Sequence, residues 1–277
     1  MKKHQMARQR TKQNLIIPSK SQSALYNLQI KIEEERRDLE QNVSLLNETL
    51  HEVRRINNQL KASALQLSNA LNDAHFDINK HSEIENIRKN IEANASLLSI
   101  RMDAYDMILN PDSIENEMIV PLSVFRKVEK VYKCLYAQKK EKNIDIRMSG
   151  HSNHLFRLSN IIELAFFIII DNAIKYSPEN EVVTIDFKEN SSSLAVSFKN
   201  WGIRPHEEEE AHLTERGFRS KIITRKTTVK GSGLGLYLLK QICDMNNVVL
   251  NIHIGKEGEM IDGLTFSPFI VKLTFSE

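Results

Sequence analysis

Apolar residues recur at spacings of three and four along the first part of the chain, and residues 21–71 contain neither glycine nor proline. This pattern predicts a long helix with one apolar seam, of the kind that pairs in a coiled coil or a bundle. A single helix of this length cannot bury such a seam by itself, so it needs partners. The seam consists of Leu25, Leu28, Ile32, Leu39, Val43, Leu46, Leu50, Val53, Ile56, Leu60, Ala64, Leu67 and Leu71.

A second periodic segment follows a break at Asn72-Asp73 and ends at Asn110-Pro111. Two helices joined by a short connection form an antiparallel hairpin, and hairpins from two chains would close a four-helix bundle. We therefore expect residues 21–111 to form a homodimerisation unit. The second stripe comprises Ile84, Ile87, Ile91, Leu98, Met102, Tyr105 and Ile108.

Beyond Pro111 the pattern alternates between short strand signals and helix signals. Strands are expected around 118–121, 144–148, 182–187, 194–198, 248–254 and 269–275, and helices over 123–141, over 158–176, around 207–216 and after the glycines at 231–235. The predicted fold class is α+β: the long-helix hairpin is followed by an α/β sandwich with a mixed, mostly antiparallel sheet. The polar stretch 202–230 is long for a plain connection, which favours a lid over the site.

Composition narrows the class of protein. The formal net charge of +2 gives no reason to expect a nucleic-acid partner. Cys134 and Cys243 lie in separate apolar segments and are expected to be reduced core residues. Residues 1–20 are expected to be a disordered basic tail, because they carry Lys and Arg side chains with little apolar periodicity. The polar, basic start of the chain is unlike a secretory signal. The longest apolar run, 164–170, is too short to span a bilayer, so we expect a cytoplasmic protein.

Three alternating glycines in Gly231-Ser232-Gly233-Leu234-Gly235-Leu236 run directly into an apolar-periodic helix. Glycine lets the backbone approach a ligand closely, and a helix N-terminus offers unpaired N–H groups and a positive dipole end. Together they indicate an anion site, most plausibly for phosphate. The turn lacks the Gly-Lys-Ser/Thr of a Walker loop and the spacing of a dinucleotide fingerprint, and a plain flexible turn stays open as the alternative.

Four stretches in a fixed order then resemble the GHKL (Bergerat-fold) ATPases and, among them, the histidine kinases. Residues 171–178, Asp-Asn-Ala-Ile-Lys-Tyr-Ser-Pro, resemble the N box, residues 200–203 resemble the first glycine box, and residues 231–236 resemble the second. Residues 213–220 are similar to the segment that opens the ATP lid of histidine kinases. The resemblance covers about residues 118–277, and it implies that the domain expected over residues 112–277 is a catalytic domain that binds ATP and Mg²⁺.

Within that domain the resemblance implies a role for each matching residue. Asn172 offers an amide oxygen, a hard ligand that suits Mg²⁺. Lys175 lies near the same helix face and can reach a phosphate or the ribose. Asn200 takes the place of the adenine-reading aspartate, and its amide oxygen can still accept from the adenine amino group. The implied nucleotide contacts are Asn172, Lys175, Tyr176, Asn200, Gly202, Arg219, Gly231, Ser232, Gly233, Leu234, Gly235 and Leu236.

The sequence departs from the family pattern at two places in this domain. Ile168 stands one helical turn before Asn172, where an Asn or Glu is usual, and Glu163 lies on the opposite helix face. Efficient ATP hydrolysis is therefore in doubt, because that carboxylate activates water in the hydrolysing members. The first glycine box has Arg204-Pro205 instead of its second glycine, which either stiffens the loop or lets Arg204 contact phosphate.

The long helix contains His51-Glu52-Val53-Arg54-Arg55-Ile56-Asn57, which resembles the H box of histidine kinases. Since Leu50 and Val53 belong to the seam, His51 is expected to point to solvent as a phosphoacceptor, with Glu52 orienting or deprotonating its ring. Ile56 replaces the usual proline, and Arg55 stands where a Thr or Asn often supports phosphatase activity. An incidental exposed histidine is the alternative, and His75 and His81 lack the surrounding motif.

These features together predict a dimeric histidine kinase that autophosphorylates His51 and passes the phosphoryl group to an aspartate of a response-regulator receiver protein. An upstream sensor protein is a further expected partner. The alternatives are a degenerate GHKL scaffold that binds nucleotide as a switch, favoured by Ile168 and Asn200, and a mechanical GHKL ATPase. His206 and His212 fit no standard metal-ligand spacing and are expected to lie in a solvated acidic loop.

Overall fold

The computed structural model describes residues 20–72, 78–109, 118–227 and 231–276. The prediction for the basic tail therefore lies outside the described residues, apart from Lys20. Two compact units are present, residues 1–41 and 42–277. The predicted division into residues 1–20, 21–111 and 112–277 stays a prediction.

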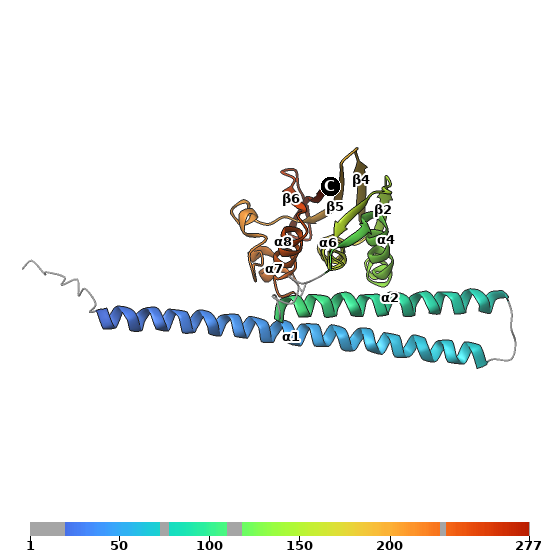
Figure 1. Ribbon diagram of the computed structural model, residues 1–277, viewed down its shortest axis with the longest axis horizontal. Helices are drawn as coiled ribbons and strands as arrows, with labels where there is room; N and C mark the ends of the chain where they lie inside the picture. The colour runs from blue at the N-terminus through green and yellow to red at the C-terminus, as the bar shows by residue number, and fades with distance from the viewer. Residues whose placement is uncertain (1–19, 73–77, 110–117, 228–230, 277) are drawn as a thin grey trace, which may run out of the picture. The chain divides into compact units, whose positions relative to one another are not determined.

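Two long helices open the chain, as the apolar periodicity predicts. Helix α1 spans Lys20–Asn72 and helix α2 spans Ile78–Leu109. From residue 42 onward the two helices run antiparallel beside each other (Figure 1). Ile56 of α1 is 1% exposed and belongs to the same buried cluster as Leu97 and Ile100 of α2. The predicted seam is therefore partly buried within one chain.

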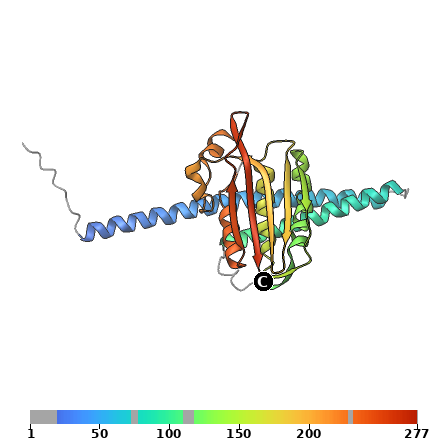
Figure 2. The same ribbon diagram turned by 90° about the horizontal axis from the view of Figure 1, so that it is seen from above.

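A sandwich of helices and strands follows, and its main sheet has the predicted mixed character. Six strands pair in the order β2-β4-β5-β8-β6, with β7 beside β8 (Figure 2). Only the β2–β4 pairing is parallel, and the other pairings are antiparallel. The strands are β2 (Asp145–Ser149), β4 (Val182–Glu189), β5 (Ser193–Ile203), β6 (Val249–Ile254), β7 (Glu259–Ile261) and β8 (Leu264–Ser276).

Shorter elements complete the sandwich. A separate antiparallel pair is formed by β1 (Val120–Ser123) and β3 (Leu155–Leu158). The helices are α4 (Val124–Cys134), α5 (Tyr136–Glu141), α6 (Ile162–Tyr176), α7 (Lys221–Lys226), α8 (Gly235–Met245) and the short 3-10 helix η1 (Glu207–His212). Ser123 caps α4, accepting a hydrogen bond from the backbone N–H of Arg126 at 3.3 Å.

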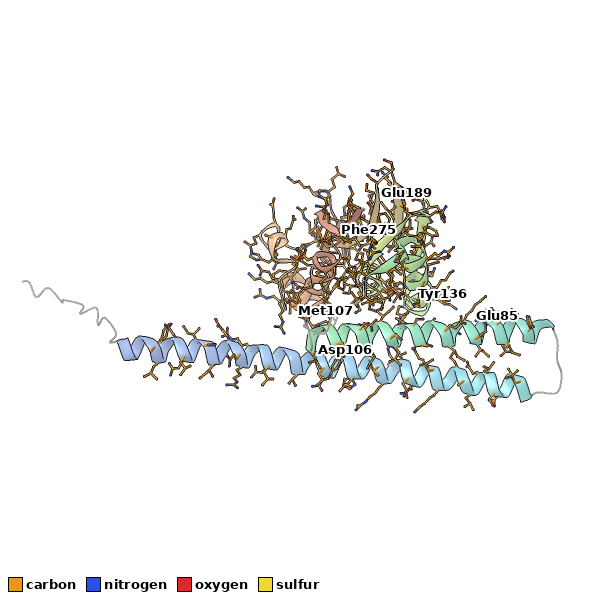
Figure 3. The ribbon with its side chains drawn as sticks, in the orientation of Figure 1. Glu85, Asp106, Met107, Tyr136, Glu189 and Phe275 are labelled. Atoms are coloured by element: carbon orange, nitrogen blue, oxygen red, sulfur yellow. The ribbon has the colours of Figure 1, made fainter. Side chains whose placement is uncertain are left out.

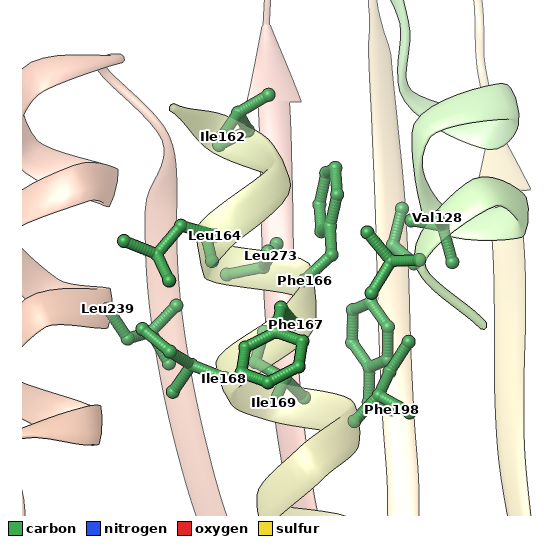
Figure 4. Close-up of a cluster of buried hydrophobic side chains, with 14 of the residues drawn as sticks. Val128, Ile162, Leu164, Phe166, Phe167, Ile168, Ile169, Phe198, Leu239 and Leu273 are labelled. Carbon is green, nitrogen blue, oxygen red and sulfur yellow. The ribbon is translucent and has the colours of Figure 1, made fainter. Parts of the chain in front are cut away.

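Helix α6 is the central element of the core because nearly every one of its side chains is buried. Leu164 and Phe166 of α6 belong to one buried cluster with Phe198 of β5 and Leu273 of β8, so the core lies between α6 and the sheet (Figure 4). The helix ends where Ser177 turns to extended backbone before Pro178. Phe275 lies inside this folded unit, whereas Glu189 lies at its periphery (Figure 3).

The structure differs from the sequence-based expectations at several short elements. The predicted helix over 123–141 is broken at Leu135, which is fully buried, and the predicted helix over 158–176 begins only at Ile162 because residues 155–158 form β3. Helix α7 and strand β7 were not predicted. Cys134 and Cys243 are both buried and free, as expected.

No helix among the described residues is both long enough and apolar enough to cross a bilayer.

Candidate functional site

One pocket collects residues that are far apart in the sequence. Its wall is formed by the C-terminal half of α6, the end of β5, the segment before α7 and the glycine turn that leads into α8. Every residue that the sequence assigned to nucleotide contact lines it: Asn172, Lys175, Tyr176, Asn200, Gly202, Arg219, Gly231, Ser232, Gly233, Leu234, Gly235 and Leu236. The fold therefore places the three boxes around a single cavity.

The glycine turn has no room for a side chain at its central glycine. Gly233 has a φ of +73°, and a Cβ there would lie 2.6 Å from the carbonyl oxygen of Phe218. Gly235 opens α8, where a Cβ would lie 3.4 Å from Cγ2 of Ile168 and 3.6 Å from Nδ2 of Asn172. The Asn172 amide thus lies beside the positive end of α8, which suits a phosphate and its metal ion.

Lys175 is held by a neighbour on its own helix. Its Nζ lies 2.7 Å from Oδ2 of Asp171, a carboxylate that is itself nearly buried and lines the pocket. This i, i+4 pair fixes the ammonium near the cavity. The role of Lys175 toward a phosphate or the ribose stays a prediction.

Asn200 is 7% exposed and lies at the end of the pocket that faces the terminus of α6. Its Nδ2 donates a hydrogen bond to Oγ of Ser177 at 3.0 Å. The sequence motifs indicate Asn200 but not Ser177, because the contact of Ser177 forms only where the end of α6 meets β5.

Glu209 organises the polar stretch between β5 and the glycine turn. Its carboxylate accepts hydrogen bonds from Oγ of Ser220 at 2.7 Å, from the backbone N–H of Lys221 at 3.0 Å and from that of His206 at 3.1 Å. Burial opposes ionisation of Glu209, but these hydrogen bonds outweigh it, so its pKa is lowered. Glu209 thereby joins η1 to the N-terminus of α7, next to Arg219.

The two departures from the family pattern have clear structural positions. Ile168 is 6% exposed and contributes an apolar surface to the pocket wall. Glu163 faces elsewhere, because its carboxylate is paired with Lys127 and Lys130 of α4. Arg204 donates from Nη1 to the carbonyl oxygen of Lys256 at 2.8 Å, so its guanidinium is directed at the loop before β7.

Helix α2 contributes pocket residues that sequence reasoning missed. Arg101, Ala104 and Ile108 line the cavity together with residues of α6. The Arg101 guanidinium carbon lies 4.6 Å from the centre of the Phe167 ring. The periodic seam identified Ile108 as apolar, but no local pattern shows which helix a distant domain will contact.

The proposed phosphoacceptor lies on a different element. His51 is exposed on α1, as expected, while its seam neighbours differ: Val53 is half-buried and Leu50 is exposed. The side chain of Glu52 lies outside the described residues, as does His75, while His81 is exposed on α2. His212 pairs with Glu215, its Nδ1 lying 2.7 Å from Oε1, and the described residues contain no group of three or more potential metal ligands.

Comparison with known families addresses the domain that contains this pocket. A family model described as histidine kinase-, DNA gyrase B- and HSP90-like ATPase matches residues 158–273. Residues 158–273 are a GHKL ATPase domain. This confirms the resemblance of the N box and glycine boxes, since all the residues that line the pocket from α6 to β8 lie within the match.

Curated relatives of the GHKL domain are signalling proteins. The sensor protein QseC of Salmonella typhi is 26% identical over 150 residues, which cover 53% of this chain and 32% of that protein. The signal transduction histidine-protein kinase ArlS of Staphylococcus aureus is 28% identical over 125 residues, which cover 45% of this chain and 25% of that protein. The match thus spans about a third or less of these relatives' length.

Among solved structures, the mycobacterial sensor histidine kinase MprB aligns with 57% of this chain and 97% of its own, at 15% identity and a TM-score of 0.45.

Proposed function

We propose that this chain is an ATP-dependent protein-histidine kinase of a two-component signalling system. It would autophosphorylate His51 and pass the phosphoryl group to an aspartate on a separate receiver protein. The observation that carries the proposal is the convergence of the N box and both glycine boxes on one pocket, in a chain whose long α1 presents an exposed histidine. The names of the curated relatives support the same class of activity.

The residues of the pocket are suited to ATP with Mg²⁺. The backbone of residues 231–235 and the N-terminus of α8 would hold phosphate oxygens, with Lys175 and Arg219 adding positive charge. The amide oxygen of Asn172 is a hard donor beside that helix end and would hold Mg²⁺. When bound, the metal ion would neutralise charge on the phosphates.

His51 supplies the acceptor for the transferred group. A neutral imidazole nitrogen would attack the γ-phosphorus, forming an N–P bond while the bond to the bridging oxygen breaks and ADP leaves. The other ring nitrogen would give up its proton to the carboxylate of Glu52, which leaves a neutral phosphorylated ring. Phosphoryl transfer of this kind depends mainly on positioning and charge neutralisation, so the absence of a base at Ile168 is compatible with it.

The proposal is tested by incubating the full chain with γ-labelled ATP and Mg²⁺ and comparing wild type with His51→Gln. We expect acid-labile, alkali-stable label on wild type and none on the variant. His81→Gln is the matched control, because His81 is also an exposed helical histidine and should keep full labelling. Label that persists in His51→Gln would place the acceptor elsewhere.

A second candidate function is a dimeric switch that binds nucleotide without kinase activity. The apolar Ile168 in the pocket wall and the amide of Asn200 in place of a carboxylate favour it. ATP binding with no label on either wild type or His51→Gln would support the switch and exclude the kinase.

Dimerisation through residues 21–111 and a receiver partner complete the proposed kinase. An upstream sensor protein would act through the long helices. The receiver is tested by adding a purified receiver domain to the labelled chain: label should move to the receiver and be lost when its acceptor aspartate is replaced by Asn.

A further inference from the structure

A short chain of hydrogen bonds connects the end of α6 to the pocket. The hydroxyl of Ser177 donates from Oγ to the carbonyl oxygen of Ala173 at 2.7 Å, and Nδ2 of Asn200 donates to the same Oγ at 3.0 Å. Ser177 is 3% exposed and Asn200 is 7% exposed. Removing one of these two buried groups therefore leaves its partner without this hydrogen bond.

The chemistry of the groups fixes the direction of each bond. A carbonyl oxygen only accepts, so the single proton of the Ser177 hydroxyl is used on Ala173. The Ala173 oxygen also accepts from the backbone N–H of Ser177 at 3.2 Å, which occupies its second lone pair. Oγ of Ser177 can therefore only accept from Asn200, and the amide must turn its nitrogen toward Ser177.

The position of Ser177 is itself held from outside the helix. Nζ of Lys142 donates to the carbonyl oxygens of Ile174 and Lys175, each at 3.0 Å, and also to that of Ser177. One ammonium thus satisfies three carbonyls at the end of α6. The hydroxyl that orients Asn200 is attached to a backbone with little freedom to move.

As a consequence, Asn200 presents a hydrogen-bond acceptor, and not a donor, at the pocket wall. With Nδ2 on Ser177, Oδ1 is the remaining acceptor of Asn200, and no described residue donates to it. Asn200 lines the cavity, so this acceptor is available to a bound molecule. An asparagine without the Ser177 contact could rotate its amide and present a donor instead.

We propose that Ser177 is a positioning residue that locks the Asn200 amide with its oxygen toward the nucleobase, and so selects a purine with a 6-amino group over one with a 6-oxo group. The selection follows because adenine donates from its amino group, whereas the 6-oxo group of guanine or hypoxanthine would face an acceptor. This inference rests on the proposed binding of a nucleotide in the pocket.

The experiment measures the ratio of affinities for ATP and inosine triphosphate, by displacement of a fluorescent ATP analogue from the full chain. Wild type is expected to favour ATP. Ser177→Ala releases the amide, so the ratio should fall by about tenfold, the effect of one hydrogen bond in a buried site. A structural defect alone would weaken both nucleotides together and leave the ratio unchanged.

The Asn200→Asp variant separates the effect of Ser177 on the orientation of the amide from its effect on packing. Asn200→Asp places acceptors on both side-chain oxygens, so in that background Ser177→Ala should no longer change the ratio. Ser177→Thr keeps the hydroxyl and should keep the wild-type ratio. Ser159→Ala removes the hydroxyl of another buried serine, outside the pocket lining, and is the matched control.

Two outcomes overturn different statements. If Ser177→Ala binds ATP with the wild-type ratio, the inference is wrong and the proposed function stands. If neither ATP nor inosine triphosphate displaces the fluorescent analogue from wild type, the proposed nucleotide binding is itself wrong. Should Ser177→Ala not fold, Ser177→Cys preserves the volume but hydrogen-bonds weakly, and the same ratio decides.

Discussion

Ile168 lines the pocket next to the Asn172 amide, at the start of α8. Its side chain is apolar, so it cannot accept a proton there. The same residue packs in the core, since it is 6% exposed. Ile168 is thus part of both the apolar core and the pocket wall.

Replacing Ile168 with Glu should raise ATP hydrolysis at least about tenfold, because a positioned general base contributes a factor of about 10² to 10⁴. Phosphate release measured on the full chain tests this. Ile168→Val is the control, since it keeps the wall apolar and should leave hydrolysis at the wild-type rate. An unchanged rate in a folded Ile168→Glu variant would show that the wall does not limit hydrolysis.

Glu209 allows a test of the polar stretch 202–230, which the sequence predicts to be a lid. A glutamine cannot accept all three hydrogen bonds that this carboxylate receives, so Glu209→Gln should weaken ATP binding by about tenfold as the segment next to Arg219 loosens. Isothermal titration with ATP measures the change. Glu208 is exposed, and Glu208→Gln should bind ATP like wild type.

Among the helices, α4 and α6 are joined by ion pairs in addition to their apolar contacts. Glu163 of α6 is paired with Lys127 and Lys130 of α4, with 2.8 Å between Oε2 and the Lys130 ammonium. Burial opposes ionisation of Glu163, but the hydrogen bonds and charges of the two lysines outweigh it and lower its pKa.

Glu163→Gln should reduce the free energy of unfolding at neutral pH by about 2 kcal/mol, since it removes charged hydrogen bonds at a largely buried site. Urea denaturation measures this. Glu129→Gln breaks an exposed pair with Lys133 on the same helix and should cost less than about 0.5 kcal/mol. Equal losses in the two variants would contradict the special role of Glu163.

The lowered pKa also gives a pH dependence with a definite sign. Glu163 contributes stability at pH values above its ordinary pKa of 4.5, and this contribution is lost as the pH falls through the lowered value in the folded state. Wild type should therefore lose stability more steeply than Glu163→Gln below pH 4.5. Thermal melts across that range, in which the two curves converge, would confirm it.

How far the sequence predicts the elements depends on how local their determinants are. Helices α1, α2 and α6 have long apolar patterns, and the turn at Gly233 follows from glycine alone, so each was predictable. Strand β3 and helix α7 are too short to carry a period, and Leu135 interrupts a periodic segment because of its place in the core. The contacts of Ser177 and Arg101 required the tertiary fold.

At the scale of the whole chain, the first compact unit is described by α1 up to residue 41, and its apolar positions are exposed. Leu25 is 61% exposed, Leu28 is 55%, Ile32 is 55% and Leu39 is 63%. Their heptad-like spacing matches the seam predicted to pair with a second copy of the chain. The proposed homodimer would bury these residues.

Substituting Ile32 and Leu39 together with Asp should convert a dimer into a monomer, or raise its dissociation constant at least about a hundredfold. Analytical ultracentrifugation of the full chain measures the mass. Ile30 is exposed on the same helix but lies off the seam, so Ile30→Asp should remain dimeric. A wild-type chain that sediments as a monomer would contradict the proposed dimer.

The two buried cysteines allow local opening of the folded unit to be followed by alkylation. Burial, with the nearby Asp244 charge, raises the pKa of Cys243 to about 12, so the native chain has almost no thiolate there. Alkylation at neutral pH should therefore proceed only through molecules in which α8 has transiently detached from the core. Because α8 begins at the glycine turn, ATP bound there should slow the modification of Cys243 by a factor that grows with the ratio of the ATP concentration to its dissociation constant. The alkylation rate of Cys134, on α4, is a second measure of local opening in the same molecule. Comparing the effect of ATP on the two alkylation rates would show whether the nucleotide stabilises only α8 or the whole folded unit.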